Sequence, residues 1–502
     1  MSQSPTKHFR KTGSLARALS RTEIFEWLVT TGYFPEPYVL PPCFFVTRHP
    51  TVQKRYFEYK RNKYLPKVTE YLRVQFPKTE LTDRTFGVVD PEIHSDIART
   101  LVRNWKSLTA CLFRKDNNVS SYSFPLPLTA RKRGSLGTLR GGRMIYEFIE
   151  MENDLAAIAY RYKFLITTDV KNFYPSIYTH SIPWAIHGKN RVRKKANRYN
   201  YDLFGNRLDR LFQNANDGCT NGIPIGPAAS DLIAEMVLAG VDRMISTEIK
   251  SDVAIARFKD DYRILAKTEE DGRAAVKALQ TALKEFNLEL NDDKTEVHAL
   301  PDGLFRPWAS QYHSANPRPK AHYGFKRFKE VCLAVVRIER ANPGGGVIDR
   351  FLADLVTRKQ KLRLSLESRR LPQIISLLLL LAGLRIKAFP KVLAIIELAL
   401  KSPFGKNQAG HIADHLVGYL EQLCKREPEN RYLIAWICYF LRANGFDGKL
   451  KGKCKFVDPI VRAVYTSRFT AFKKCPDFKL FQGVKASAKR ISMLKHLDVF
   501  NR

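Results

Sequence analysis

The sequence predicts an α+β protein whose first part contains a β-sheet and whose last part is helical. Two β-branched, apolar runs, 162–169 and 253–266, are typical of strands, and the second has a turn at its centre. Beyond Asn342-Pro-Gly-Gly-Gly346, the best linker in the chain, apolar residues recur at helical spacing. A chain of 502 residues is too long for one small core, so we expect two or three domains.

The helical part is predicted to be a helical-repeat-like domain, because its helices are similar in length and separated by short Pro or Gly breaks. These helices are expected at 349–368, 372–386, 389–401, 408–426 and 429–444. Three consecutive segments follow from the pattern: an N-terminal arm with a helix and an extended segment (1–60), a sheet-containing domain (61–340) and a C-terminal α-helical domain with a basic tail (347–502). Within the first segment, we expect 1–20 to be a flexible basic arm and a helix to begin near Thr22.

Charge and composition limit the partners. The chain has 84 Lys and Arg against 49 Asp and Glu, a formal charge of +35, which favours a polyanion partner. No apolar run reaches the 18 residues of a membrane span, so we expect no membrane partner. The eight cysteines show no Cys-x-x-Cys spacing, which favours neither zinc nor a disulfide framework and is typical of a cytoplasmic protein.

Three aspartates stand where the predicted strands end. Asp260 and Asp261 lie at the tip of the hairpin in 253–266, and Asp169 ends the strand that begins at Tyr162. Adjacent carboxylates repel each other, and a divalent cation removes that repulsion, although an Asp-Asp pair is also common in ordinary turns. If the strands pair, the three side chains can hold two Mg²⁺ ions, with Mn²⁺ as the alternative, for nucleotidyl transfer.

Four segments in this order resemble the palm motifs of reverse transcriptases, and the resemblance implies a right-hand fingers-palm fold. They are Asp169 with Phe173 and Tyr174, Gly222-Ile-Pro-Ile-Gly226-Pro-Ala-Ala-Ser230, Phe258-Lys-Asp260-Asp261, and Leu290-Asn-Asp-Asp-Lys294-Thr295.

The resemblance also implies roles for individual residues. The metal-binding positions are Asp169, Val170, Asp260 and Asp261. Lys294 is expected to protonate the departing pyrophosphate, and an exposed lysine without that task is the alternative. The positions expected to bind the nucleotide are Arg140 and Arg143 in a glycine-rich hairpin on the triphosphate, Tyr174 against the sugar, and Gly226 and Pro227 near the template base pair.

The amino-acid sequences of segments 172–189 and 223–227 are similar to those of the bacterial abortive-infection and defence-associated reverse transcriptases. This implies synthesis of cDNA from dNTPs in antiphage defence, with a non-coding RNA or a protein as primer. Ile225 stands where retroviral and intron enzymes have glutamine, so RNA-directed and template-independent synthesis both stay open. An RNA-dependent RNA polymerase and an inactive RNA-binding scaffold are the alternative functions.

Two further patterns suggest partners. Residues 189–198 hold six cations in ten positions and precede Tyr199 and Tyr201, which suits either a nucleic-acid backbone or a solvated face. Leu377 to Leu381 are five consecutive leucines, which cover every side of a helix. Such a helix is buried by its own neighbours or by another protomer. The defence family forms homo-oligomers, so the resemblance favours a closed trimer or hexamer.

Overall fold

The computed structural model describes residues 4–60, 63–78, 82–127, 148–249, 253–367, 369–450, 452, 456–472 and 475–497. It divides into two compact units. Unit 1 contains residues 1–35, 48–73 and 86–305, and unit 2 contains residues 36–47, 74–85 and 306–502. This division differs from the consecutive domains expected from the sequence, because two short early segments fold with the helical part and the boundary lies at Phe305 rather than near residue 340.

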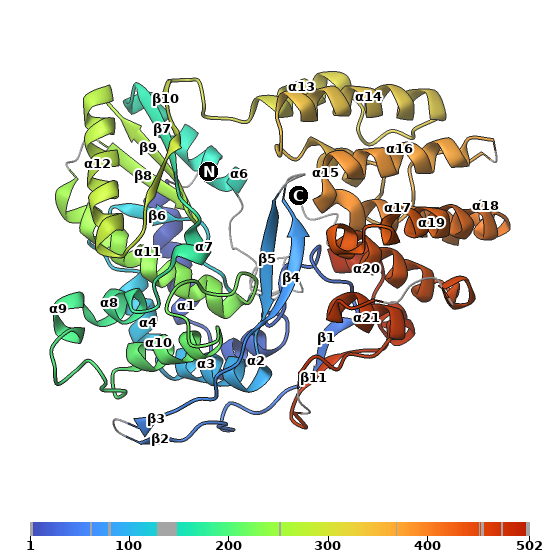
Figure 1. Ribbon diagram of the computed structural model, residues 1–502. Helices are drawn as coiled ribbons and strands as arrows, with labels where there is room; N and C mark the ends of the chain where they lie inside the picture. Colours follow the sequence, from blue (N-terminus) through green and yellow to red (C-terminus); the bar gives the residue numbers. More distant parts are fainter. Residues whose placement is uncertain are drawn as a thin grey trace. The chain divides into compact units, whose positions relative to one another are not determined.

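Unit 1 combines a mixed sheet with helices (Figure 1). Its helices are α1 (Pro5–Arg17), α2 (Arg21–Val29), α3 (Pro91–Arg103), α4 (Trp105–Leu112), α6 (Phe148–Ala156), α7 (Phe173–Ser176), α8 (Ser181–His187), α9 (Lys189–Val192), α10 (Phe204–Asn214), α11 (Ala228–Glu248), α12 (Glu269–Glu285) and the 3-10 helix η2 (Ala159–Arg161). Its strands are β2 (Tyr59–Lys60), β3 (Lys63–Tyr64), β6 (Val119–Ser121), β7 (Phe164–Val170), β8 (Val253–Phe258), β9 (Asp261–Ala266) and β10 (Leu290–Ala299). Strands β4 (Leu72–Pro77) and β5 (Asp83–Val88) pair with each other, and the division between the units passes through both.

The central sheet has the order β10-β7-β9-β8-β6. Strands β7, β8, β9 and β10 pair antiparallel, whereas β6 pairs parallel with β8. Helix α12 packs on this sheet so closely that a Cβ at Gly272 would lie 2.3 Å from the Ile166 side chain of β7. The predicted hairpin in 253–266 is confirmed. Strand β10 lies at an edge of the sheet.

The N-terminal residues form a helix, so the prediction of a flexible arm is wrong. Helix α1 begins after Ser4, whose hydroxyl accepts a hydrogen bond from the backbone N–H of Lys7, and it buries Phe9 and Ala16. The Trp105 indole N–H donates to the Ala16 carbonyl at 2.8 Å. Sparse apolar residues were sufficient because they fall on one side of the helix, and the cations fall mainly on the other.

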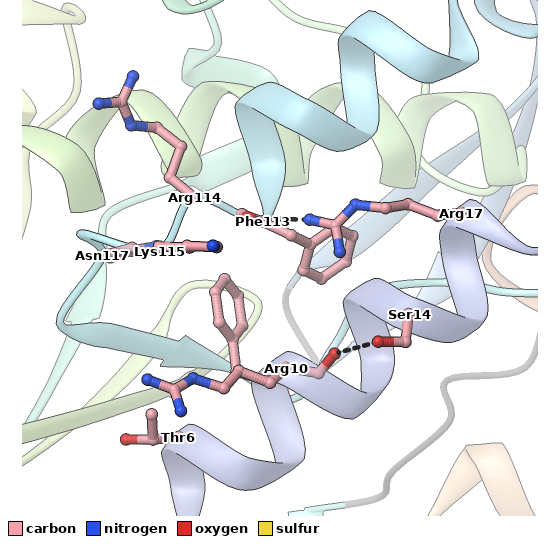
Figure 2. Close-up of a pocket in the computed structure, with 9 residues that line it drawn as sticks. Thr6, Arg10, Ser14, Arg17, Phe113, Arg114, Lys115 and Asn117 are labelled. Carbon is pink, nitrogen blue, oxygen red and sulfur yellow. Dashed lines mark hydrogen bonds between the residues drawn. The ribbon is translucent and has the colours of Figure 1, made fainter.

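Helix α1 and the segment 113–117 line a cavity of about 510 Å³ (Figure 2). Its apolar floor is formed by Phe9 and Phe113, whose ring centroids are 5.2 Å apart. The Arg17 guanidinium closes one side by donating to the Phe113 carbonyl at 3.0 Å. These contacts around the cavity hold α1 against the segment that follows α4.

Unit 2 consists largely of helices (Figure 1). They are α13 (Pro307–Ala315), α14 (Phe325–Ala341), α15 (Val347–Asp354), α16 (Leu371–Leu384), α17 (Phe389–Lys401), α18 (Pro403–Asn407), α19 (Ala409–Cys424), α20 (Glu427–Ala443), α21 (Pro459–Thr466), α22 (Val484–Arg490), α23 (Met493–Leu497) and the 3-10 helices η3 (Ile386–Ala388) and η4 (Asp447–Leu450). Strand β1 (Phe44–Arg48) pairs with β11 (Lys479–Phe481).

Four of the five predicted C-terminal helices are confirmed, and one is wrong beyond its first two turns. Helix α15 ends at Asp354, and the following residues form turns in which Gln360 has a φ of 58°. The backbone N–H of Thr357 donates to the Lys361 carbonyl at 2.8 Å, which closes a loop instead of continuing the helix. The glycines at 344–346 form the turn between α14 and α15, inside unit 2.

We expect the buried histidine of α3 to make unit 1 sensitive to acid. His94 is fully buried, its Nε2 donates to the Leu28 carbonyl at 2.8 Å, and burial lowers its pKa from 6.5 to about 4. The unfolded state binds the proton first, so stability is lost as the pH falls from 6.5 towards 4, by about 3 kcal/mol for this shift. His94→Gln should retain stability at pH 8 and flatten this loss.

Thermal unfolding measured between pH 8 and 4.5 checks this expectation. His313→Gln, at an exposed position of α13, serves as the control and should keep the wild-type profile. An unchanged acid profile in His94→Gln would show that the buried imidazole does not contribute to the loss.

Candidate active site

Two neighbouring strands bring the predicted aspartates to one edge of the sheet. Strand β7 carries Asp169 at its end, β9 begins at Asp261, and these two residues are directly paired in the antiparallel register. Asp260 immediately precedes Asp261 in a tight turn, in which Lys259 has a φ of 55°. Side chains of directly paired residues lie on the same face of a sheet, with Cα atoms about 4.5–5.5 Å apart. The structure therefore brings Asp169 and Asp261 together, as the sequence predicts.

The three carboxylates are electrostatically unfavourable to one another. Burial, followed by the charges of Asp261 and Asp169, raises the pKa of Asp260 to about 7. Burial and the charge of Asp169 raise the pKa of Asp261 to about 6, although the residue as a whole is exposed. The Oδ1 atom of Asp169 is buried and has no hydrogen-bond partner. A group of this kind is stabilised by a cation.

Lys294 contacts this group from the edge strand. Residues 292–295 of β10 lie opposite the single residue Thr168, so the strand bulges beside Asp169. The bulge lets the Lys294 ammonium reach Asp169 Oδ2 at 2.7 Å, and this hydrogen bond is the main cause that raises the lysine pKa. Lys294 is therefore part of the site.

The carboxylates fit a divalent metal in donor type and charge. They offer hard oxygen ligands, and Asp169 has an unsatisfied buried oxygen. In the described ranges, however, no three His, Cys, Asp or Glu side chains are arranged to hold a metal ion as they stand. Binding would require the aspartates to turn towards one point and Asp169 to release Lys294. Val170, the fourth predicted position, is buried and donates its N–H to the Asp260 carbonyl at 3.3 Å.

Tyr174 lies in α7 and is almost fully buried, with 8% of its surface exposed. Its hydroxyl donates to Asp231 Oδ1 at 2.5 Å, and burial together with Asp231 raises its pKa well above 10. The Lys259 ammonium lies 5.6 Å from the ring centroid and 3.3 Å from Asp231. These contacts fix the orientation of the ring beside the turn that carries Asp260.

Gly226 and Pro227 form the entry to helix α11. Gly226 has a φ of 127°, and a Cβ at this position would lie 2.7 Å from the Pro35 ring. The preceding carbonyl of Ile225 accepts from the Gly87 N–H at 2.8 Å. The segment is thus held by two other parts of unit 1. Arg140 and Arg143, the predicted triphosphate ligands, lie outside the described residues.

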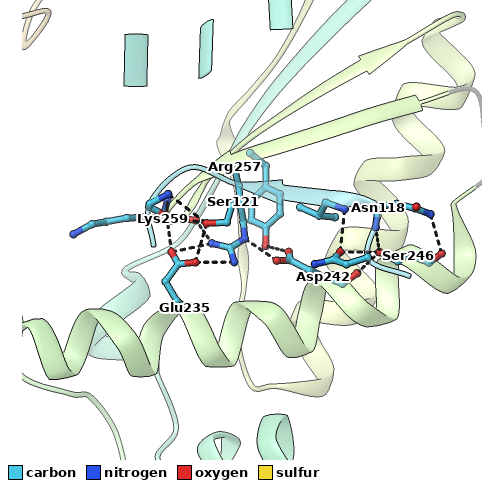
Figure 3. A network of polar contacts seen from close by, with 11 residues as sticks. Asn118, Ser121, Glu235, Asp242, Ser246, Arg257 and Lys259 are labelled. Atoms are coloured by element: carbon cyan, nitrogen blue, oxygen red, sulfur yellow. Dashed lines mark hydrogen bonds and ion pairs between the residues drawn. The ribbon is translucent and has the colours of Figure 1, made fainter. Parts of the chain in front are cut away.

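Sequence reasoning missed a buried ion network beneath the hairpin (Figure 3). Arg257 of β8 is 1% exposed and lies between Asp242 and Glu235 of α11, at 2.8 and 3.1 Å. The Tyr262 hydroxyl of β9 donates to the other oxygen of Asp242 at 3.0 Å. A signal was present, because two acids seven residues apart in an apolar helix lie on one side, and an arginine interrupts an apolar strand.

The network also holds the turn that carries Asp260. The Arg257 guanidinium donates to the Lys259 carbonyl at 3.4 Å. The Ser123 hydroxyl accepts from the Lys259 N–H at 2.7 Å and donates to Glu235 at 2.5 Å. Both backbone groups of Lys259 are therefore fixed. These bonds hold Lys259 in the left-handed conformation that starts the turn.

Comparison with known proteins places these segments in one domain. Residues 103–323 match the family model described as reverse transcriptase (RNA-dependent DNA polymerase). No curated protein matches the chain.

Solved structures of yeast telomerases show a weak likeness. Apo telomerase from Candida tropicalis is 11% identical over 69% of each chain, with a TM-score of 0.35. Telomerase from Candida albicans with the TWJ fragment of telomeric RNA is 8% identical, over 67% of this chain and 62% of that one, with a TM-score of 0.30. The corresponding Candida tropicalis complex is 12% identical, over 80% and 65%, with a TM-score of 0.32.

The matched range includes Asp169, the glycine-proline entry to α11, the Asp260-Asp261 turn and Lys294. The chain therefore contains a reverse transcriptase domain over residues 103–323 and is an RNA-directed DNA polymerase, a nucleotidyltransferase.

Proposed function

We propose that the chain synthesises cDNA from dNTPs by two-metal nucleotidyl transfer at Asp169, Asp260 and Asp261. The observation that carries this proposal is the direct pairing of Asp169 with Asp261, beside Asp260 and with an unsatisfied buried oxygen. When bound, Mg²⁺, or Mn²⁺ as the alternative, would supply the positive charge that holds the triphosphate and the attacking 3′-oxygen. The aspartates and the backbone of Val170 provide its oxygen ligands.

Lys294 has two roles in this proposal. Before metal binds, its ammonium compensates the charge of Asp169 at 2.7 Å. With the carboxylates holding a metal instead, the ammonium would be free to donate its proton to the departing pyrophosphate. The bulge of β10 permits both, because it places the lysine on the solvent side of the sheet edge, with 62% of its side chain exposed.

The remaining substrate contacts in this proposal are those that the sequence motifs imply. The Tyr174 ring, fixed through its hydroxyl on Asp231, limits the space beside the incoming sugar and disfavours a 2′-hydroxyl. Gly226 and Pro227 shape the loop for the template base pair, and Arg140 and Arg143 bind the triphosphate.

We further propose that the enzyme acts in the bacterial cytoplasm in antiphage defence, copying an RNA template or extending DNA without one, with a non-coding RNA or a protein as primer. The charge of +35 supports a nucleic-acid partner. No helix in the described part of the chain is long and apolar enough to cross a membrane.

A homo-oligomer, trimer or hexamer, is part of the same proposal. The leucine run lies in α16, where Leu378 and Leu381 are buried but Leu380 is 64% exposed. Leu384 of α16 is 41% exposed, and Leu333 of the neighbouring α14 is 49% exposed. Exposed leucines on adjacent helices favour a contact with another protomer.

Removal of one carboxylate tests the catalytic assignment. Asp260→Asn keeps the shape of the side chain but removes a metal ligand and a repulsive charge. Primer extension should fall by roughly a thousandfold or more, and the unfolding midpoint without metal should hold or rise. Added Mg²⁺ should raise the midpoint of the wild type and not that of the variant. Asp302→Asn, at an exposed position, is the control. Normal extension by Asp260→Asn would disprove the assignment.

Measurements of sugar selection by two variants distinguish the contribution of the Tyr174 ring from that of its hydroxyl. Tyr174→Ala opens space, so the use of ribonucleotides relative to deoxynucleotides should rise by about tenfold or more. Tyr174→Phe loses the bond to Asp231 but keeps the ring, so its ratio should stay near that of the wild type. Single-nucleotide incorporation with each triphosphate measures both. Equal ratios in all three proteins would leave Tyr174 as a core residue.

Assembly is measured by light scattering coupled to size exclusion, after nuclease treatment and in high salt. The wild type should elute as a multiple of 57.7 kDa, and Leu380→Lys should shift it towards the monomer. Lys479→Ala, on an exposed position of β11, is the control and should not change the mass. A monomeric wild type would reject protein-mediated assembly.

A further inference from the structure

Unit 1 has a second cavity, of about 610 Å³, formed by helices α8, α9 and α10 with the segment that joins α9 to α10. None of the residues assigned above to nucleotidyl transfer lines it. Its size falls in the range of small-molecule sites. Its lining combines aromatic rings, cations and amides: Tyr178, Trp184, Tyr199 and Tyr201; Lys189, Arg193, Arg198 and Arg210; Asn206, Gln213 and Asn287.

The aromatic rings offer flat surfaces at the mouth of the cavity. Tyr199 is 63% exposed, and its ring lies 5.7 Å from the Arg198 guanidinium. Tyr178 packs edge-on against Trp184 with centroids 5.7 Å apart. The Lys189 ammonium lies 4.9 Å from the Trp184 ring. An exposed tyrosine ring in the lining of a cavity suits a surface on which a base stacks.

The charge of the lining is strongly positive. Four cations line the cavity, and of these Lys189 pairs with Glu285 at 2.8 Å. The single carboxylate of the lining, Asp209, already accepts hydrogen bonds from His180 at 2.5 Å and Gln213 at 2.6 Å. The bond to Asp209 raises the pKa of His180, which favours a further positive charge. The Nε atom of Arg210 is buried without a partner. An anion would satisfy this excess.

The segment that carries Arg198 and Tyr199 is held in place. The Asn206 amide donates to the carbonyls of Asn197 and Asn200, at 2.8 and 2.9 Å. The Asn197 amide donates in turn to the Arg191 carbonyl at 2.9 Å. Cations are therefore presented on an ordered loop, and little conformational entropy is lost when a ligand binds.

We propose that this cavity is a subsite for a single-stranded segment of nucleic acid. A base stacks on Tyr199, and the adjoining phosphates lie on Arg193, Arg198 and Arg210. This inference rests on the proposed function only in that both involve nucleic acid. It concerns binding away from the aspartates, and it can be tested without catalysis.

The test is fluorescence anisotropy of the full chain with a 5′-labelled 20-nucleotide single strand, as DNA and as RNA, in buffer containing EDTA. Tyr199→Ala should weaken binding about tenfold, the order of one lost stacking contact. Tyr160→Ala is a matched control, because Tyr160 is 78% exposed and lies 5.3 Å from Arg161, yet stands outside the cavity. It should bind like the wild type.

A second pair of variants tests the phosphate contact. Arg198→Ala should lower the slope of log affinity against log salt by about one, whereas Arg161→Ala should leave the slope unchanged. Both arginines are exposed and both lie beside a tyrosine, so loss of an arginine-tyrosine contact is matched in the control.

Three outcomes would overturn the proposal. One is equal affinity of Tyr199→Ala and Tyr160→Ala for the single strand. Another is that Tyr199→Ala loses as much affinity for a blunt duplex as for the single strand, because bases that are stacked inside a duplex cannot reach the ring. The third is calorimetric binding of 5′-AMP that Tyr199→Ala abolishes while strand affinity is unchanged, which would make the cavity a site for free nucleotide. These binding assays contain EDTA and need no catalysis. Their results therefore do not depend on whether Asp260→Asn retains or loses polymerase activity.

Discussion

The buried guanidinium of Arg257 is the interaction on which the geometry of the active site depends. Removing an arginine from water is costly, and here the cost is offset by Glu235 and Asp242 on helix α11. The two acids outnumber the cation, and burial raises the pKa of Asp242 to about 6 in spite of Arg257. Loss of one partner of such a network typically costs about 3–5 kcal/mol, because the other charges stay buried.

This network determines where the turn that carries Asp260 lies. Arg257 and Ser123 hold the carbonyl and the N–H of Lys259, so the turn cannot change its conformation without breaking a partly buried hydrogen bond. The turn carries two acids whose pKa values are raised by burial, that of Asp260 also by Asp261 and Asp169, and that of Asp261 also by Asp169. Repulsion at the edge of the sheet is thus opposed by attraction beneath it. The repulsion between the aspartates lowers the stability of the fold, and the buried ion pairs of Arg257 offset that loss. Functional sites commonly contain such unfavourable interactions, compensated elsewhere in the protein.

The residues that sequence reasoning found are those whose signal is local. Asp169, Asp260 and Asp261 follow strand patterns, and the register of β7 and β9 brings the first and the last together. Helix α17 was predicted with its observed ends at 389 and 401, because its apolar residues repeat at helical spacing and prolines flank it. The Arg257 network was missed because it joins side chains of three segments, 121–123, 235–242 and 257–262, whose contacts depend on the tertiary fold.

The same reason explains the errors at the ends of elements. Helix α1 has few apolar residues, and only its contacts with Trp105 and Phe113 show that they are enough. The predicted helix at 349–368 has a suitable composition throughout. Yet Leu364 forms an isolated bridge with Tyr323, and that tertiary pairing is incompatible with a continued helix.

Unit 2 shows that the helical part is not an independent addition to the polymerase domain. The Tyr432 hydroxyl of α20 donates to the Tyr38 carbonyl at 2.6 Å, and its ring lies 4.9 Å from Phe76. Both partners come from segments that precede the palm in the sequence. The matched reverse transcriptase range also continues past residue 305 through α13, which belongs to unit 2. A cut near residue 340 would therefore remove α16 from α14 and Tyr432 from its partners.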